Sequence, residues 1–240
     1  MPAPLQILFG TDGWRGVIAR DFTFEGVRLV AGAVAATLRA GHPEDHRFLV
    51  AVGHDTRFLS RRFAQTAADV LAALGVEVRL TTSHFPTPML ACAIPDLKAR
   101  GGLMVTASHN PPSYNGLKVR IADGGCATTT LTDQIETEVR RLSGDLSVRP
   151  EGASPSTGQT TVGAIDLFDP LPLYQERLRT LVDMERIARS GLYVVLDPMY
   201  GATQGIVAAW LRQIGLKVEE IHAELNPWFG GVPPEPLCAH

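Results

Sequence analysis

Apolar residues recur along the first part of the chain in two alternating patterns. Residues 25–39 and 59–74 carry apolar side chains at the spacing of one helix face, which predicts two amphipathic helices. Gly75 follows the second helix as a C-terminal cap. Residues 48–52 form a short apolar run and residues 76–82 alternate, so both predict strands.

The same alternation continues through the middle of the chain. Strands are predicted at 103–106 and 117–121, on either side of a polar loop, and a helix is predicted at 131–142. Strands and helices that alternate on this scale indicate an α/β fold. We therefore expect mixed, largely parallel sheets with flanking helices in a complete first domain, residues 1–150.

Hydrophobic periodicity disappears in residues 144–163, where Ser, Thr, Gly and Pro dominate and indicate a domain boundary. The segment 160–240 is predicted to begin a second α/β domain. Two strands with one or two helices bury little surface, so this second domain is expected to be incomplete and the chain to be a fragment. The elements predicted there are a helix at 173–182, a strand at 192–197, a helix at 202–214 and a strand at 216–221.

Composition narrows the class of protein. The 240 residues are 45% hydrophobic and 20% charged with a net charge of −3, so no general attraction to nucleic acid or to an anionic membrane is expected. The cysteines Cys92, Cys126 and Cys238 are far apart and form no C-x-x-C, which favours reduced thiols over a disulfide framework or a zinc site. With no signal-peptide pattern and no membrane-spanning apolar run, a cytoplasmic protein is expected.

The chemistry-bearing residues gather in one loop, Thr106-Ala-Ser-His-Asn-Pro-Pro112, which follows a predicted buried strand. Ligands of α/β proteins usually bind at the carboxyl ends of strands. Ser108 brings a hydroxyl and His109 an imidazole, and Lys118 follows where the chain re-enters the sheet. The pair Asn115-Gly116 between them is typical of a turn.

The spacing of these residues disfavours a serine hydrolase. Neighbouring side chains diverge in an extended loop, so His109 is poorly placed to deprotonate Ser108, and no G-x-S-x-G surrounds the serine. A serine that accepts a phosphoryl group suits the setting better, because that transfer needs alignment, cations and a group that manages one proton. Lys118 offers a cation and proton transfer, and His109 an auxiliary acid or base. An ordinary strand-loop-strand turn capped by polar residues remains the alternative.

Four segments resemble the α-D-phosphohexomutases, the family of phosphoglucomutases, phosphomannomutases and phosphoglucosamine mutases. The loop just described, with Asn115-Gly-x-Lys118, is similar to the phosphoserine loop of that family. The three other segments that carry the resemblance are Phe9-Gly-Thr-Asp-Gly-Trp-Arg-Gly16, Gly53-His-Asp-Thr-Arg57 and Asp197-Pro-Met-Tyr-Gly201.

The resemblance implies a role for each matching residue. Ser108 would be the phosphorylated nucleophile and donor, and its phosphate would be one ligand of a Mg²⁺ ion. His109 and Lys118 would assist proton transfer and bind phosphate. Lys118 and Arg15 would bind the phosphate of the substrate and neutralise its charge; the alternative for Arg15 is a surface arginine in a glycine-rich turn.

Further residues of these motifs are expected to support the site rather than react. Asp55 and Arg57 would form an internal ion pair, and Asn110 and Asn115 would shape the loop. His54 stands where the family usually has an arginine.

The activity implied is the interconversion of hexose 1-phosphate and hexose 6-phosphate through a phosphoserine and a hexose 1,6-bisphosphate. Trp14 and the Asn110–Tyr114 run favour glucose or mannose phosphates as partners, with glucosamine phosphate as the alternative substrate.

The family's magnesium loop, Asp-Gly-Asp-x-Asp-Arg, does not occur in these 240 residues. We therefore expect little or no turnover from this chain alone, which would hold the nucleophile half of a composite site. A different class of function, a non-catalytic module that associates with another chain, predicts a large exposed apolar face on the second domain.

Overall fold

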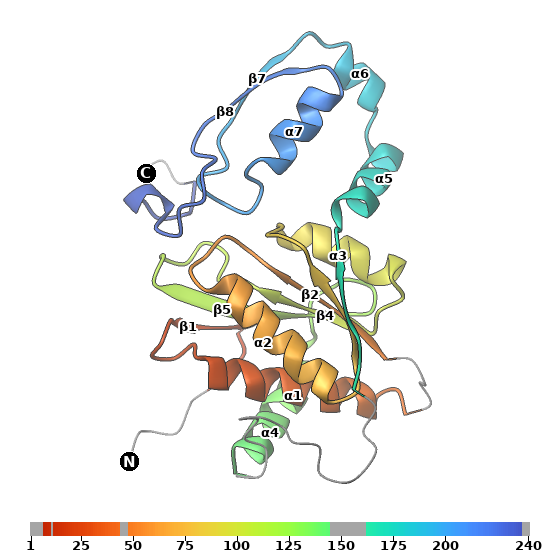
Figure 1. Ribbon diagram of the computed structural model, residues 1–240, viewed down its shortest axis with the longest axis vertical. Coiled ribbons are helices and arrows are strands. Elements are labelled where there is room, and N and C mark those ends of the chain that lie inside the picture. Colours follow the sequence, from red (N-terminus) through yellow and green to blue (C-terminus); the bar gives the residue numbers. More distant parts are fainter. Residues whose placement is uncertain (1–6, 11, 44–47, 145–161, 237–240) are drawn as a thin grey trace.

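A six-stranded mixed sheet forms the centre of the larger part of the protein, in the order β1-β5-β4-β2-β3-β6 (Figure 1). The pairs β2–β3, β2–β4 and β3–β6 are parallel, whereas β5 is antiparallel to both β4 and β1. The predicted mixed, largely parallel sheet is therefore confirmed. The strands are β1 (Trp14–Val17), β2 (Leu49–His54), β3 (Glu77–Thr81), β4 (Gly101–Val105), β5 (Tyr114–Ile121) and β6 (Ile165–Phe168).

The computed structural model describes residues 7–10, 12–43, 48–144 and 162–236. Most of the predicted boundary segment 144–163, and Cys238, lie outside these residues. We call residues 7–144 and 162–168 the first unit and residues 171–236 the second unit.

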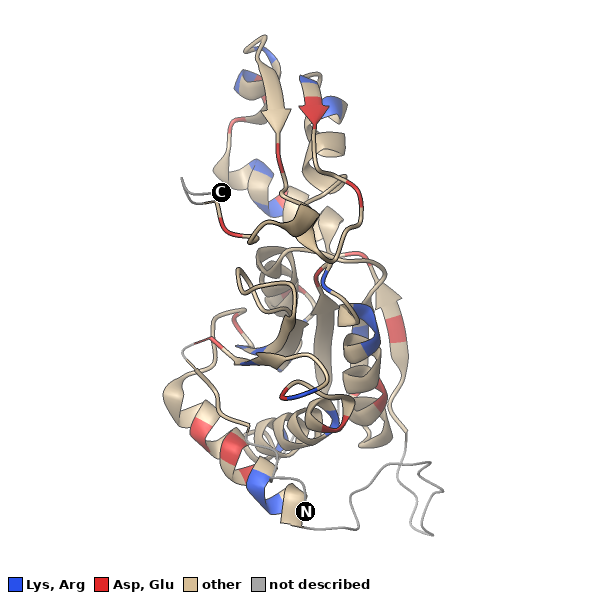
Figure 2. Cartoon of the chain, turned by 90° about the vertical axis from the view of Figure 1, so that its left-hand side faces the viewer, with Lys and Arg blue, Asp and Glu red and all other residues tan. Residues whose placement is uncertain are grey.

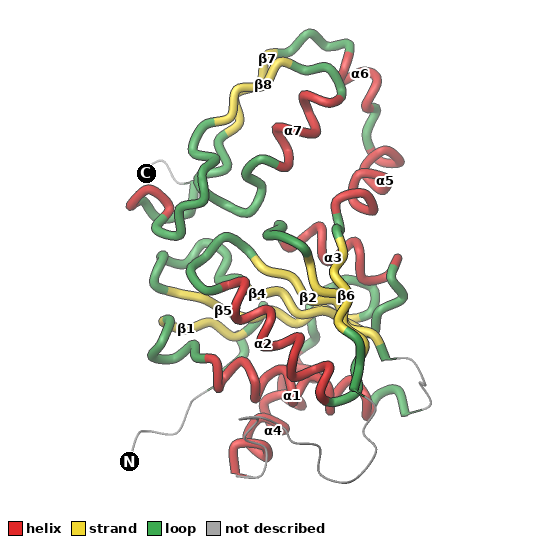
Figure 3. Tube along the Cα trace, viewed as in Figure 1, coloured by secondary structure: helices red, strands yellow, loops and turns green. Residues whose placement is uncertain are grey.

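Helices cover both faces of the six-stranded sheet (Figure 3). Three helices pack against one face and bury the main apolar core, while a single helix covers β2 and β4 on the other face. The first helix begins where the Thr23 hydroxyl accepts a hydrogen bond from the Gly26 amide, which satisfies one of its free N–H groups. The helices are α1 (Phe24–Ala40), α2 (Ser60–Ala73) and α4 (Thr129–Gly144) on the first face and α3 (Thr87–Asp96) on the second.

Three elements of the first unit were not predicted as such. Helix α3 contains Pro88 in its first turn and Pro95 in its last, and proline usually signals the end of a helix. Strand β1 lies within a glycine-rich motif. Strand β6 is only four residues long, and the sequence assigned it to the domain at 160–240. The structure instead pairs β6 with β3 of the first unit.

The second unit contains the predicted β-α-β arrangement, in which β7 and β8 pair in parallel. Neither strand has a buried residue, and nor do α5 and α6. Large apolar side chains are exposed here, which agrees with the apolar face expected of an associating module. Its elements are α5 (Leu171–Leu181), α6 (Met184–Ala188), β7 (Tyr193–Leu196), α7 (Ile206–Gln213), β8 (Lys217–Glu220) and a 3₁₀ turn at Phe229–Gly231.

Charged residues of both signs are interspersed over the two units rather than gathered by sign (Figure 2). This distribution matches the small net charge of the chain. No helix among the described residues has the length and apolar character needed to cross a membrane.

We expect Phe63→Ala to destabilise the protein by about 3–5 kcal/mol, because it opens a cavity in the main core. Phe63 is 1% exposed and its ring meets that of Phe22 edge-on, with 4.8 Å between centroids. Urea unfolding followed by circular dichroism measures the loss. The control is Phe58→Ala, since Phe58 is 55% exposed and should lose little. Equal losses in the two variants would contradict this packing.

Candidate active site

Ser108 lies just beyond the carboxyl end of β4, one of the two central strands of the sheet. Its backbone is left-handed, with φ of 57°, a conformation that costs a non-glycine residue free energy and persists only where its surroundings impose it. The Ser108 amide donates a hydrogen bond to the Thr106 hydroxyl at 3.0 Å. Both Ser108 and His109 are exposed at the tip of the loop.

The guanidinium group of Arg57 forms hydrogen bonds with the backbone of this loop and of the start of β5, residues 106–114, which we call the serine loop. Its Nη1 donates hydrogen bonds to the carbonyl oxygens of Pro111 at 2.9 Å and Tyr114 at 3.1 Å. Its Nη2 donates to the carbonyl oxygens of Ser108 at 2.8 Å and Asn110 at 2.6 Å. One side chain from the β2–α2 connection therefore binds four backbone carbonyls of the serine loop.

Asp55 balances the charge of Arg57. The carboxylate Oδ2 lies 3.4 Å from Arg57 Nε, so the predicted internal ion pair is present. Asp55 Oδ1 accepts hydrogen bonds from the Ser60 hydroxyl at 2.6 Å and the Arg57 amide at 3.0 Å. Burial lowers the pKa of Arg57 and the Asp55 charge opposes this, and arginine stays charged because its ordinary pKa is so high.

The pair Asn115-Gly116 lies inside β5 and is not the turn that the sequence suggested. Asn115 is fully buried, and its Nδ2 donates to the Ser60 hydroxyl at 2.9 Å. A Cβ atom on Gly116 would lie 2.7 Å from the Thr106 carbonyl oxygen and 2.8 Å from that of Trp14. Glycine is needed here because three strands approach closely beneath the loop.

Strand register gathers basic side chains on one face of the sheet. Arg15 on β1 pairs with Gly116 on β5, and Lys118 and Arg120 follow at the alternate positions of β5 that share its face. Leu117, which has the opposite orientation, belongs to the main core. The predicted site residues Arg15 and Lys118 thus lie on the same side of the sheet.

Arg15 also contacts the serine loop directly. Its Nη1 donates to Asn110 Oδ1 at 2.8 Å, while the Asn110 backbone carbonyl accepts from Arg57. The structure therefore places two of the predicted residues, Ser108 and Arg15, at one loop. This contact favours a site role for Arg15 over that of an isolated surface arginine.

Asp12 is a member of the site that sequence reasoning did not single out, although it lies in the same N-terminal motif as Arg15. Its carboxylate accepts a hydrogen bond from Lys118 Nζ and lies 3.2 Å from Arg120 Nη2. Burial of the Asp12 carboxyl tends to raise its pKa, but the hydrogen bond from Lys118 and the two cationic charges outweigh this and lower it. Asp12 holds the two basic side chains in place.

The described residues do not make up a magnesium site by themselves. No group of three or more His, Cys, Asp or Glu side chains among them is arranged to hold a metal ion. Mg²⁺ binds through several oxygen ligands, and a phosphate on Ser108 would supply one. The remaining ligands would have to come from outside the described residues, and we assign no step to the ion.

The second unit reaches the base of the site through the motif at 197–201. The Thr56 hydroxyl donates to the Tyr200 carbonyl oxygen at 3.0 Å. The ring of Phe229 lies against the Arg57 guanidinium, with 5.1 Å from the guanidinium carbon to the ring centroid. Thr56 and Arg57, in the connection between β2 and α2, therefore link the serine loop to the second unit.

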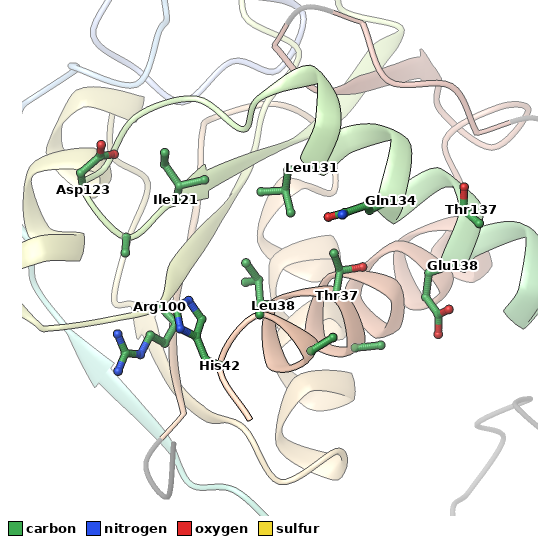
Figure 4. Close-up of a pocket in the computed structure, with 14 residues that line it drawn as sticks. Thr37, Leu38, His42, Arg100, Ile121, Asp123, Leu131, Gln134, Thr137 and Glu138 are labelled. Atoms are coloured by element: carbon green, nitrogen blue, oxygen red, sulfur yellow. The ribbon is translucent and has the colours of Figure 1, made fainter. Parts of the chain in front are cut away.

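A cavity of about 940 Å³ lies away from this site (Figure 4). Arg100 and Ile121, which line it, stand at the start of β4 and the end of β5, whereas Ser108 follows the end of β4. Its other lining residues include Leu38 on α1 and Leu131 on α4. The cavity therefore opens at the opposite end of these strands from the serine loop.

Family comparison covers both units. Residues 6–144 match the family described as phosphoglucomutase/phosphomannomutase, alpha/beta/alpha domain I, and residues 172–239 match its alpha/beta/alpha domain II. Among curated relatives, a phosphoglucosamine mutase of Anaeromyxobacter dehalogenans (strain 2CP-C) is 31% identical over 96% of this chain and 51% of its own length.

A second relative, a phosphoglucosamine mutase of Acidothermus cellulolyticus, is 36% identical over 90% of this chain and 44% of its own length. A solved structure from Thermus thermophilus, assigned as a phosphomannomutase, is 38% identical and superposes with a TM-score of 0.81. The match covers 99% of this chain and 50% of the other. The chain thus spans about half the length of the relatives that it matches.

The lowered pKa of Asp12 gives a pH-dependent prediction for Asp12→Asn. An aspartate in the unfolded chain titrates near pH 3.9, roughly. Because the folded pKa is lower, the stabilisation from the Asp12 charge is complete above that pH and is lost as pH falls through the folded pKa. The difference in unfolding free energy between parent and variant should be constant above about pH 5 and shrink below about pH 4.

Urea unfolding at intervals between pH 7 and pH 3 measures this difference. The matched control is Asp69→Asn, an exposed aspartate on α2 that contacts Gln65 and no cation of the site. A difference for Asp12→Asn that stays the same over the whole range would contradict the charge pairing.

Proposed function

Since the chain belongs to the phosphoglucomutase/phosphomannomutase family, we propose that it carries the phosphoryl-relay half of a hexose-phosphate mutase, with Ser108 as the relay. The observation that carries this proposal is the placement of Ser108. It is exposed at a strand end and held in a left-handed conformation, and Arg15 contacts the loop that bears it.

The first half of the proposed reaction moves the phosphoryl group outwards. A hydroxyl oxygen of the hexose phosphate attacks the phosphorus of phosphorylated Ser108, and the bond from Ser108 Oγ to phosphorus breaks as the new O–P bond forms. Lys118, whose ammonium group is paired with Asp12, gives a proton to the departing Ser108 Oγ and takes the hydroxyl proton of the sugar in exchange, with His109 as an auxiliary base. Arg15 neutralises the phosphoryl oxygens, which suits a reaction whose catalysis rests on positioning and charge.

The second half reverses these roles. The bisphosphate reorients, Ser108 Oγ attacks its other phosphorus, and Lys118 takes the serine proton as it gives one to the sugar oxygen that leaves. The net result is a hexose phosphate with its phosphate at the other position and a phosphorylated Ser108. Both halves need the Ser108 hydroxyl and the cations Arg15 and Lys118 close together. The pairing of β1 with β5 supports this, because it sets Arg15 opposite Gly116, two residues before Lys118.

The substrate class we propose is hexose phosphates, glucose or mannose first, with Mg²⁺ as the family's expected ion. The names of the relatives divide between glucosamine phosphate and mannose phosphate. Trp14, on which the preference for glucose or mannose partly rested, is buried against Phe22 with 4.5 Å between ring centroids. It is not available to contact a sugar, so glucosamine phosphate stays the alternative substrate.

A second candidate function is a module that associates with another chain. It is favoured by the exposed apolar side chains of the second unit, such as Tyr193, Val195 and Trp228. Such a surface on a chain half the length of its relatives is suited to packing against further protein. Gel filtration together with a phosphatase-sensitive mass measurement separates the candidates. A monomer with phosphate on Ser108 favours the mutase, and an aggregating chain without that phosphate favours the module.

We expect Ser108→Ala to abolish phosphoryl uptake and to lower mutase turnover of a complete enzyme at least about 1,000-fold. The parent chain, incubated with hexose 1,6-bisphosphate, should gain about 80 Da at Ser108, which intact-mass measurement and a phosphatase detect. Turnover with glucose, mannose and glucosamine 1-phosphates ranks the substrates.

The control is Cys92→Ala, a cysteine on α3 outside the site, which should retain uptake and turnover. Normal hexose-phosphate interconversion by Ser108→Ala would overturn the proposed function. Equal losses in both variants would mean that a folding defect had been mistaken for chemistry.

A further inference from the structure

The Arg57 side chain directs both terminal nitrogens at backbone carbonyls, while Nε pairs with a carboxylate by charge and makes no hydrogen bond. A guanidinium carries five N–H groups in a planar fork. Four backbone carbonyls of the serine loop face Nη1 and Nη2, and the Asp55 carboxylate faces Nε at 3.4 Å. The side chain is 0% exposed, so bulk water does not compete for these partners. Lysine, with three donors on one nitrogen, cannot reproduce this fork.

The four carbonyls fix the shape of the loop at both ends. Ser108 and Asn110 lie at its tip, while Pro111 and Tyr114 lie where it returns to β5. Because the planar guanidinium group binds all four carbonyl oxygens, it restricts the path of the backbone between these residues. The Ser108 carbonyl oxygen, on the residue with the left-handed backbone, is thus bound by a side chain 51 positions earlier in the chain.

Arg57 also contacts the second unit. Phe229 is 3% exposed, and its ring lies 5.1 Å from the guanidinium carbon. Phe229 is left-handed, with φ of 51°, and the next residue, Gly230, is pressed so closely to the Tyr200 ring that a Cβ atom would lie 2.5 Å away. The Thr56 hydroxyl also donates to the Tyr200 carbonyl oxygen. The second unit therefore contacts two neighbouring residues, Thr56 and Arg57.

We propose that Arg57 is a positioning residue through which the second unit sets the geometry of the Ser108 loop. Phe229 fixes the plane of the guanidinium, and the guanidinium fixes the carbonyls that aim Ser108. This inference rests on the proposed function in one respect only, namely that the aim of Ser108 matters for phosphoryl transfer. The coupling between Phe229, Arg57 and the loop is a property of the fold itself.

The test measures hydrogen exchange in peptides covering residues 106–116, together with the rate at which Ser108 gains phosphate from hexose 1,6-bisphosphate. The variants are Arg57→Lys, Arg57→Ala and Phe229→Leu, the last of which keeps the apolar contact but removes the aromatic face. The matched control is Arg79→Lys, which changes an arginine paired with Asp166 at the β3–β6 side of the sheet.

We expect Arg57→Lys to speed exchange in the loop at least about 10-fold while exchange in β2 and β3 stays at the parent rate. Phosphoryl uptake should fall at least about 10-fold in the same variant, since misplacement of a reacting group costs rate. Added guanidinium chloride at low millimolar concentration should restore part of the uptake to Arg57→Ala. Phe229→Leu should shift both readouts in the same direction by about threefold, and Arg79→Lys should shift neither.

Several results would overturn the inference. One is loop exchange in Arg57→Lys at the parent rate; another is an increase spread equally over the sheet, which marks a merely structural residue. Unchanged loop exchange in Phe229→Leu would remove the second unit from the coupling. If the parent itself gains no phosphate, the proposed function fails for this chain, and loop exchange alone then decides the inference.

Discussion

The site depends on one buried cation that binds backbone carbonyls. Carbonyl groups of an irregular loop need hydrogen-bond donors, and leaving them buried without partners costs free energy. Arg57 supplies four such bonds from a single planar group, and Asp55 balances its charge. With these bonds in place a serine can stay in a left-handed conformation at the edge of the sheet. Without them four backbone carbonyl groups in and next to the loop would lose their hydrogen-bond donors.

Sheet register adds the second requirement, which is the placement of charge. The antiparallel pairing of β1 with β5 sets Arg15 opposite Gly116 and leaves Lys118 on the same face. Lys118 and Arg120 lie close together, and the Asp12 carboxylate pairs with both and balances part of their positive charge. The first unit therefore combines a shaped loop with local basic groups, although the chain as a whole is slightly acidic. In the proposed function, local charge rather than net charge would attract the phosphorylated substrate.

The second unit is joined to this arrangement at a small number of points. Its motif at 197–201 and the turn at Phe229 contact the residues that precede α2, whereas much of its apolar surface is exposed. The family match extends over this unit, and the chain spans about half the length of its curated relatives. The contact at Arg57 gives the second unit a physical route to the loop that needs no large movement.

The sequence by itself determined the elements with long apolar periodicity and singled out the loop for which we propose the chemistry. Each of the helices and strands predicted from periodicity is present within four residues at either end, because burial on one face leaves a local signal. Partners chosen across long separations leave no such signal. Only the tertiary structure decided that β6 pairs with β3, that Asn115-Gly116 is a strand, and that Asp12 pairs with Lys118. The sequence likewise marked Arg57 only as half of an ion pair, since its four carbonyl partners, 51 to 57 positions away, become neighbours only when β2 and β4 lie side by side.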